Sequence, residues 1–218
     1  MIPLRDDQPT RSFPIVTLLI IAVNAVVFIG WQRSIGIEQS VDRAGFLPIE
    51  LTSHVAGGWT HVFTSMFMHG GWMHLIGNMW FLWIFGNNIE DNCGPIRYLL
   101  FYLLCGIAAI FAQALSTPDS PYPIIGASGA ISGVLGAYLL LFPRARVLTL
   151  VLLPFFFTTL RMPAMLLLLL WFAVQLISDL AVPDGSASVA FRAHIGGFLT
   201  GMLLVPFFKR GDVRLFAP

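Results

Sequence analysis

Apolar residues gather in long runs along this chain. Six of these runs come close to the roughly 20 residues that a helix needs to cross about 30 Å of hydrocarbon. Their charged residues lie only near the ends, and the runs cover residues 13–31, 72–90, 96–116, 124–142, 162–180 and 192–208. The pattern predicts an all-α polytopic membrane protein built as a bundle of six transmembrane helices.

Two further segments differ from these runs. Residues 147–160 are apolar but form a run of only 14 residues, with Pro154 inside it. A helix of that length would reach about 21 Å, so we expect an interfacial or re-entrant segment. The connection of residues 32–71, between the first two spans, is long and rich in aromatic residues. We expect it to rest on or dip into the membrane face.

The composition narrows the class of protein. Apolar residues make up 57% of the chain and charged residues 11%, whereas a soluble domain has about 25% charged residues. The net charge is only +1, which gives no long-range attraction to polyanions. A soluble domain, a disordered chain and a basic nucleic-acid-binding protein are therefore excluded. Cys93 and Cys105 are too few for a disulfide framework or a zinc site, and we expect no metal or cofactor.

The positions of Lys and Arg predict the orientation of the spans. With six spans and a cytosolic N-terminus, only Arg33, Arg43 and Arg192 lie on the non-cytosolic side. The nine basic residues in cytosolic segments are Arg5, Arg11, Arg97, Arg144, Arg146, Arg161, Lys209, Arg210 and Arg214. We therefore expect two cytosolic tails, residues 1–12 and 209–218, flanking one membrane domain of residues 13–208.

Polar side chains inside apolar spans carry the most information, because in hydrocarbon they are costly unless they are partnered or face a cavity. His74 and Asn78 in the second span are four residues apart, which places them on one helix face. Both can donate hydrogen bonds and could bind an anionic oxygen. Alternatively, they form an interhelical hydrogen-bonding pair that holds helices together.

Ser128 lies in a GASG sequence at the start of the fourth span. Pro121 and Pro123 end any preceding helix, so we expect Ser128 in the first turn of a new one. Backbone N–H groups there lack intrahelical partners, and the helix dipole favours an anion. The alternative is a packing face of small residues, formed by Gly129, Ser132, Gly133, Gly136 and Ala137. The two interpretations are compatible.

His194 lies about one turn inside the sixth span. Gly197 and Gly201 follow it as a G-x-x-x-G face that would pack against the small residues of the fourth span. That packing could bring the imidazole to the Ser128 hydroxyl, although a lone histidine in a span can also be structural. The set would supply a nucleophile, a base and oxyanion donors.

These motifs resemble those of the rhomboid family of intramembrane serine proteases. The resemblance rests on GASG around Ser128, AHIGG around His194 and HLIGN from His74 to Asn78, in the spans and order of the family. It covers roughly residues 10–210. It implies a six-helix rhomboid-like bundle with residues 32–71 as a membrane-associated loop between the first two helices. A six-span form without an added seventh span also implies a prokaryotic plasma membrane.

The resemblance implies an intramembrane serine endopeptidase that cleaves transmembrane helices of membrane-protein substrates through an acyl-enzyme. Ser128 would be the nucleophile and His194 the general base, a dyad without an acidic member. The Ser128 N–H group and the His74 and Asn78 side chains would form the oxyanion hole. Substrates would enter from the lipid, with the end of the fifth span and residues 181–192 as gate and cap. Neither a cofactor nor nucleic acid is implied.

Two positions depart from the family pattern. Many members carry a Trp-Arg pair in the first loop, where this chain has Trp59 and Thr60. The anchoring of that loop is therefore expected to differ. Many members also place an aromatic residue four positions after the nucleophile, stacked on the histidine ring. Here that position is Ser132, so another group must orient His194, and the sequence does not identify it.

Two other classes of function fit the sequence less well. A rhomboid-like protein that only binds membrane clients would typically lack the serine or the histidine, and this chain has both. A small transporter would favour repeated halves and charged residues along a pathway, and neither pattern is visible. The protease interpretation is the one that uses all four polar residues.

Overall fold

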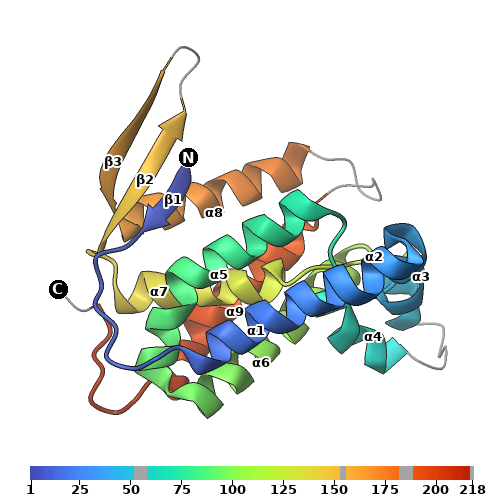
Figure 1. Cartoon of the computed structure of the whole chain (residues 1–218), viewed down its shortest axis with the longest axis horizontal. Coiled ribbons are helices and arrows are strands. Elements are labelled where there is room, and N and C mark those ends of the chain that lie inside the picture. Colours follow the sequence, from blue (N-terminus) through green and yellow to red (C-terminus); the bar gives the residue numbers. More distant parts are fainter. Residues whose placement is uncertain (52–57, 153–155, 182–188, 217–218) are drawn as a thin grey trace.

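The computed structural model of the chain describes residues 1–51, 58–152, 156–181 and 189–216 (Figure 1). Its main elements are helices that run back and forth: α1 (Ile15–Val26), α5 (Trp72–Cys93), α6 (Pro95–Ser116), α7 (Ser128–Leu141), α8 (Ala164–Ala181) and α9 (Phe191–Phe208). α1 continues through a π-helical turn (Val27–Gln32) into α2 (Arg33–Ile35). The short helices α3 (Ile37–Ala44) and α4 (Gly58–Thr64) lie at the far end of the bundle (Figure 1).

Four helical segments are long and apolar enough to cross a membrane. They are Ile15–Ile35, Pro95–Ser116, Ala164–Ala181 and Phe191–Phe208. α7 is apolar but has only 14 residues. α5 has 22 residues, and its polar side chains, among them His74 and Asn78, lower its hydropathy. A mostly helical chain with helices of membrane-spanning length is thus confirmed, while the sixfold crossing stays a prediction.

A small sheet corrects the all-α prediction. β1 (Ile2–Arg5), β2 (Arg146–Leu152) and β3 (Phe157–Pro163) form an antiparallel sheet in the order β1-β2-β3. The 147–160 run, expected to be interfacial or re-entrant, supplies β2 and much of β3, and Pro154 lies outside the described residues. In β2, the buried residues Val147 and Thr149 alternate with the more exposed Arg146, Leu148 and Leu150, a pattern typical of a half-buried strand.

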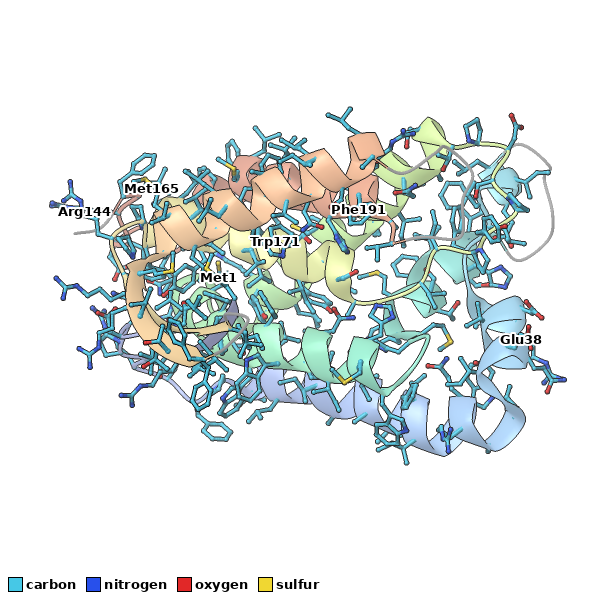
Figure 2. All side chains as sticks on the ribbon, turned by 90° about the horizontal axis from the view of Figure 1, so that it is seen from above. Met1, Glu38, Arg144, Met165, Trp171 and Phe191 are labelled. Atoms are coloured by element: carbon cyan, nitrogen blue, oxygen red, sulfur yellow. The ribbon has the colours of Figure 1, made fainter. Side chains whose placement is uncertain are left out.

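Both termini lie at the end of the bundle that carries this sheet. The Arg210 N–H donates to the Asn92 carbonyl (2.8 Å) and the Phe216 N–H to the Leu140 carbonyl (2.7 Å). These bonds place the C-terminal segment beside the last residues of α5 and α7. Arg144 lies at this end, and Glu38 lies at the opposite end (Figure 2).

Two carboxylates near the end of α5 hold the start of α1. Glu90, 2% exposed, accepts hydrogen bonds from the Val16 N–H (2.9 Å), the Thr17 N–H (2.8 Å) and the Thr17 hydroxyl (2.8 Å). Asp91 accepts from the N–H groups of Arg11 and Ser12, both at 3.0 Å. The first N–H groups of a helix have no intrahelical acceptor and carry partial positive charge. The Glu90 carboxylate therefore acts as the cap that α1 lacks in its own sequence, and Asp91 holds the residues just before the helix.

α7 lies at the centre of the bundle, with nearly all of its residues buried. Its contact with α9 leaves no room for side chains at the glycines. A Cβ atom at Gly197 would lie 2.1 Å from the Gly129 carbonyl oxygen, and one at Gly201 would lie 2.0 Å from that of Gly133. The predicted packing of the G-x-x-x-G face against the small residues of the fourth span is therefore confirmed.

Gly201→Ala is expected to destabilise the protein by about 2–3 kcal/mol, because the new methyl group would meet the backbone of α7 rather than a flexible side chain. The matched control is Gly77→Ala in α5, where nothing lies within 4 Å of an added Cβ. Thermal unfolding in detergent should show a lowered Tm for the first variant only. Equal melting temperatures would contradict the close contact of α7 and α9.

Candidate active site

Ser128 is the first residue of α7, as the two prolines before it predict. The chain turns into this helix at Gly126, whose φ of +114° is in the left-handed region that favours glycine. The Gly126 N–H donates to the Ser65 carbonyl (2.8 Å) and so ties the turn to the first loop. At such a helix start the backbone N–H groups are available to an anionic oxygen.

His194, in the first turn of α9, lies against Ser128. Its Nε2 atom is 2.8 Å from the Ser128 Oγ atom. Its other ring nitrogen, Nδ1, is 2.8 Å from the Oε1 atom of Gln175 on α8. The structure thus brings together the predicted nucleophile and base, and it adds a third side chain to the same line of hydrogen bonds.

His74 approaches the same point from α5. The Gly70 N–H donates to His74 Nδ1 (3.3 Å), so the ring proton is on Nε2 and this atom is a donor. A Cβ atom at Gly126 would lie 2.8 Å from His74 Nε2 and 3.6 Å from Ser128 Oγ. The His74 donor and the Ser128 hydroxyl therefore border the same small space, which only a glycine at position 126 leaves open.

Asn78 lies one turn further along α5 and is 9% exposed. Within the described part of the chain, its Nδ2 atom has no hydrogen-bond partner. A buried donor left unpaired costs roughly 1–3 kcal/mol. Such a donor is available to an oxygen atom brought in by a substrate, whereas the alternative of an interhelical pair would require a partner that the described residues do not supply.

His69 is fully buried beside this site. Its ring packs edge-on against that of His74, with centroids 5.0 Å apart, and neither of its ring nitrogens has a partner among the described residues. Its backbone is held by the Gln32 side chain: the His69 N–H donates to Gln32 Oε1 (2.9 Å), and Gln32 Nε2 donates to the His69 carbonyl (3.1 Å).

The first loop has anchors of its own where the family's Trp-Arg pair is absent. His61, directly after Thr60, bonds to Glu50 at 2.9 Å. The Thr64 hydroxyl donates to the Ala44 carbonyl (2.8 Å). Phe46 and Ile124 form a two-bond backbone bridge that joins the loop to the segment before Ser128. These contacts, together with Gln32, fix the loop beside the start of α7.

A pocket beside Ser128 is lined mainly by small residues, including Gly126, Gly129 and Ala193. Of the four polar residues that the sequence singled out, the described lining of this pocket includes Ser128 and not His74, Asn78 or His194.

Cys93 and Cys105 are buried free thiols. Among the residues that the structure describes, no group of three or more His, Cys, Asp and Glu could hold a metal ion. Of the expected gate and cap, residues 182–188 lie outside the described residues. The described ends on either side are joined by an ion pair between Asp179 and Arg192 (3.0 Å).

Gln175 was not among the site residues predicted from the sequence. The signal was present, since Gln175 is a polar side chain in the apolar interior of a predicted span, the same criterion that singled out His74 and Ser128. Its partner on another helix could not be identified from spacing alone.

Comparisons with known proteins agree with the resemblance. The family model for the Rhomboid domain matches residues 56–211. The chain is 34% identical over 126 residues to Rhomboid protease GluP of Bacillus subtilis (strain 168), a match that covers 58% of this chain and 24% of that protein. It is 27% identical over 217 residues to RHOMBOID-like protein 12, mitochondrial, of Arabidopsis thaliana, covering 91% of this chain and 60% of that protein. The chain therefore spans less than two thirds of either relative.

Proposed function

Since the chain belongs to the Rhomboid family, we propose that it is an intramembrane serine endopeptidase that cleaves transmembrane helices of membrane-protein substrates. The observation that carries the proposal is the 2.8 Å contact between Ser128 Oγ and His194 Nε2, which come from separate helices. A serine hydroxyl becomes a nucleophile when an adjacent base can take its proton. No cofactor is required for this chemistry.

In the proposed reaction, the Ser128 oxygen attacks the carbonyl carbon of the scissile peptide bond, and its proton passes to His194 Nε2. The protonated imidazole then gives this proton to the leaving amine as the C–N bond breaks, which leaves an acyl-enzyme. Water, deprotonated by His194, attacks the ester in a second step. The acid product leaves and the Ser128 hydroxyl is restored.

The negative oxygen of each tetrahedral intermediate needs donors that are already in place. We assign this role to the Ser128 N–H group at the start of α7, to His74 Nε2–H and to the unpaired Asn78 amide. The small space beside Gly126 favours this assignment, because His74 Nε2 and Ser128 Oγ both border it.

We further propose that α1, α5, α6, α7, α8 and α9 are six spans of one membrane domain, residues 13–208, with both tails in the cytosol. The shared location of the two termini supports an even number of crossings. α7, at about 21 Å, is shorter than the hydrocarbon layer, so a six-span arrangement places Ser128 below the membrane surface. Substrates would then reach it from the lipid, past α5 and α8.

Membership of the family supports an integral membrane protein. For the compartment we propose a prokaryotic plasma membrane, as expected from the six-span form. The Arabidopsis relative is mitochondrial by name, so an organelle membrane is the alternative. Expression of the full chain in bacterial cells and in eukaryotic cells, followed by separation of their plasma and mitochondrial membranes, tests which membrane takes up the protein.

Ser128→Ala and His194→Ala are each expected to lower cleavage of a reporter with a transmembrane substrate segment by more than about 10³-fold. Their melting temperatures should stay near that of the unmodified protein. Ser132→Ala is the matched control, because this serine lies one turn away and its hydroxyl already donates to the Ser128 carbonyl (2.7 Å). Cleavage retained by Ser128→Ala would overturn the mechanism, and binding of the reporter without cleavage by the unmodified protein would favour a client-binding role.

Asn78→Ala is expected to lower kcat by about 10²–10³-fold with little change in KM, because the donor acts on the oxyanion rather than on the bound substrate. Its Tm should not fall, since the variant removes an unpaired buried donor. Asn92→Ala at the other end of α5, whose side chain donates to the Asn88 carbonyl (2.8 Å), is the control. A rise in KM with kcat unchanged would contradict the assignment.

A further inference from the structure

Both ring nitrogens of His194 have a hydrogen-bond partner, and only the partner Ser128 was predicted from the sequence. Gln175 Oε1 lies 2.8 Å from His194 Nδ1, and Ser128 Oγ lies 2.8 Å from His194 Nε2. Gln175 is 7% exposed. Three helices, α8, α9 and α7, thus contribute one side chain each to a continuous line of hydrogen bonds.

The amide of Gln175 has a defined orientation. Its Nε2 atom donates to the Trp171 carbonyl one turn earlier on α8 (3.2 Å). A carbonyl oxygen can only accept, so the NH₂ group belongs on that side and Oε1 faces the imidazole. Oε1 can also only accept. His194 Nδ1 must therefore carry the ring proton, which leaves Nε2 free to accept from the Ser128 hydroxyl.

Aromatic rings flank the imidazole, but a ring contact does not determine which ring nitrogen carries the proton. The Trp171 ring lies 6.0 Å from that of His194 at 35°, and the Phe191 ring lies 6.4 Å away at 88°; both residues are labelled in Figure 2. Ser132, at the position where many rhomboid proteins carry an aromatic residue, uses its hydroxyl on the Ser128 carbonyl. Hydrogen bonding to Nδ1 is thus the contact that distinguishes one ring tautomer from the other.

We propose that Gln175 is a positioning residue, which holds His194 in the tautomer that acts as base toward Ser128. This inference rests on the proposed function. In triad hydrolases a carboxylate occupies the corresponding place beside Nδ1 and also stabilises the imidazolium by its charge. An amide oxygen supplies the orientation without the charge. The chain would therefore be a Ser-His-Gln system, with a neutral third member on a different helix.

The position of α8 determines whether Gln175 can reach His194. Asp179 follows Gln175 by four residues and so lies on the same face of α8. It pairs with Arg192, two residues before His194 (3.0 Å). Arg192 also donates to the Ser116 carbonyl at the end of α6 (3.1 Å). This ion pair fixes α8 against α9 near the level at which Gln175 meets His194.

The test uses Gln175→Met, which keeps the length and removes the acceptor, and Gln175→Glu, which adds a charge. Gln175→Met is expected to lower kcat by about 10–100-fold with KM unchanged within about twofold. In ¹⁵N-histidine spectra of the detergent-solubilised full chain, His194 should change from the Nδ1–H form to a mixture of tautomers. Gln175→Glu should retain activity and move the acidic limb of the pH–kcat profile upward by about 1 unit or more, because a carboxylate favours the imidazolium.

Gln113→Met is the matched control. Gln113 accepts from the Ala193 N–H (3.2 Å), next to His194 in sequence, and its substitution should leave the tautomer and the pH profile unchanged. A Gln175→Met protein that loses kcat but keeps both of these readouts would have a merely structural defect and would overturn the proposal. If Gln175→Met does not fold, Gln175→Glu decides: an acidic limb of its pH–kcat profile that is unchanged from the unmodified protein would overturn the proposal. Activity in Ser128→Ala would instead overturn the proposed function itself.

Discussion

The close approach of α7 and α9 sets the distances on which the rest of the site depends. Gly197 and Gly201 of α9 lie directly over the carbonyl oxygens of Gly129 and Gly133 of α7, so the two backbones meet without side chains between them. Ser128 directly precedes Gly129, and His194 lies three residues before Gly197. The contact between backbones therefore also fixes the 2.8 Å between the hydroxyl and the imidazole. Packing and proposed chemistry share one constraint.

The buried polar side chains fall into two groups. Some are satisfied and join elements: Glu90 holds the start of α1, and Gln32 holds the backbone of the first loop at His69. Others have buried atoms without a partner in the described part of the chain: the ring of His69, the amide nitrogen of Asn78, the amide oxygen of Asn24 and the hydroxyls of Tyr98 and Tyr102. Of these, the His69 ring packs against His74, and Asn78 follows His74 by one turn of α5. Because an unpaired buried donor is costly, these two groups are candidates for pairing with substrate or water.

Local sequence signals predicted much of this arrangement. The prolines before Ser128 placed it at a helix start, and the G-x-x-x-G pattern indicated which helix would bring His194 to it. The sheet was missed because an apolar run alone does not identify its pairing partners, which for β2 are β3, close in sequence, and β1, some 140 positions earlier. The group that orients His194 was missed for the same reason, since Gln175 and His194 meet only when α8 packs on α9. The role of Gly126 likewise depends on the approach of His74 from α5.

The most direct test of the central claim, that His194 activates Ser128, is covalent labelling with a fluorophosphonate, mapped by mass spectrometry of the detergent-solubilised protein. A hydroxyl activated by an adjacent base should give one adduct for each chain, located on Ser128. In His194→Ala the labelling rate should fall by more than about 10²-fold. An adduct on a different residue, or a labelling rate of Ser128 that does not depend on His194, would contradict the account.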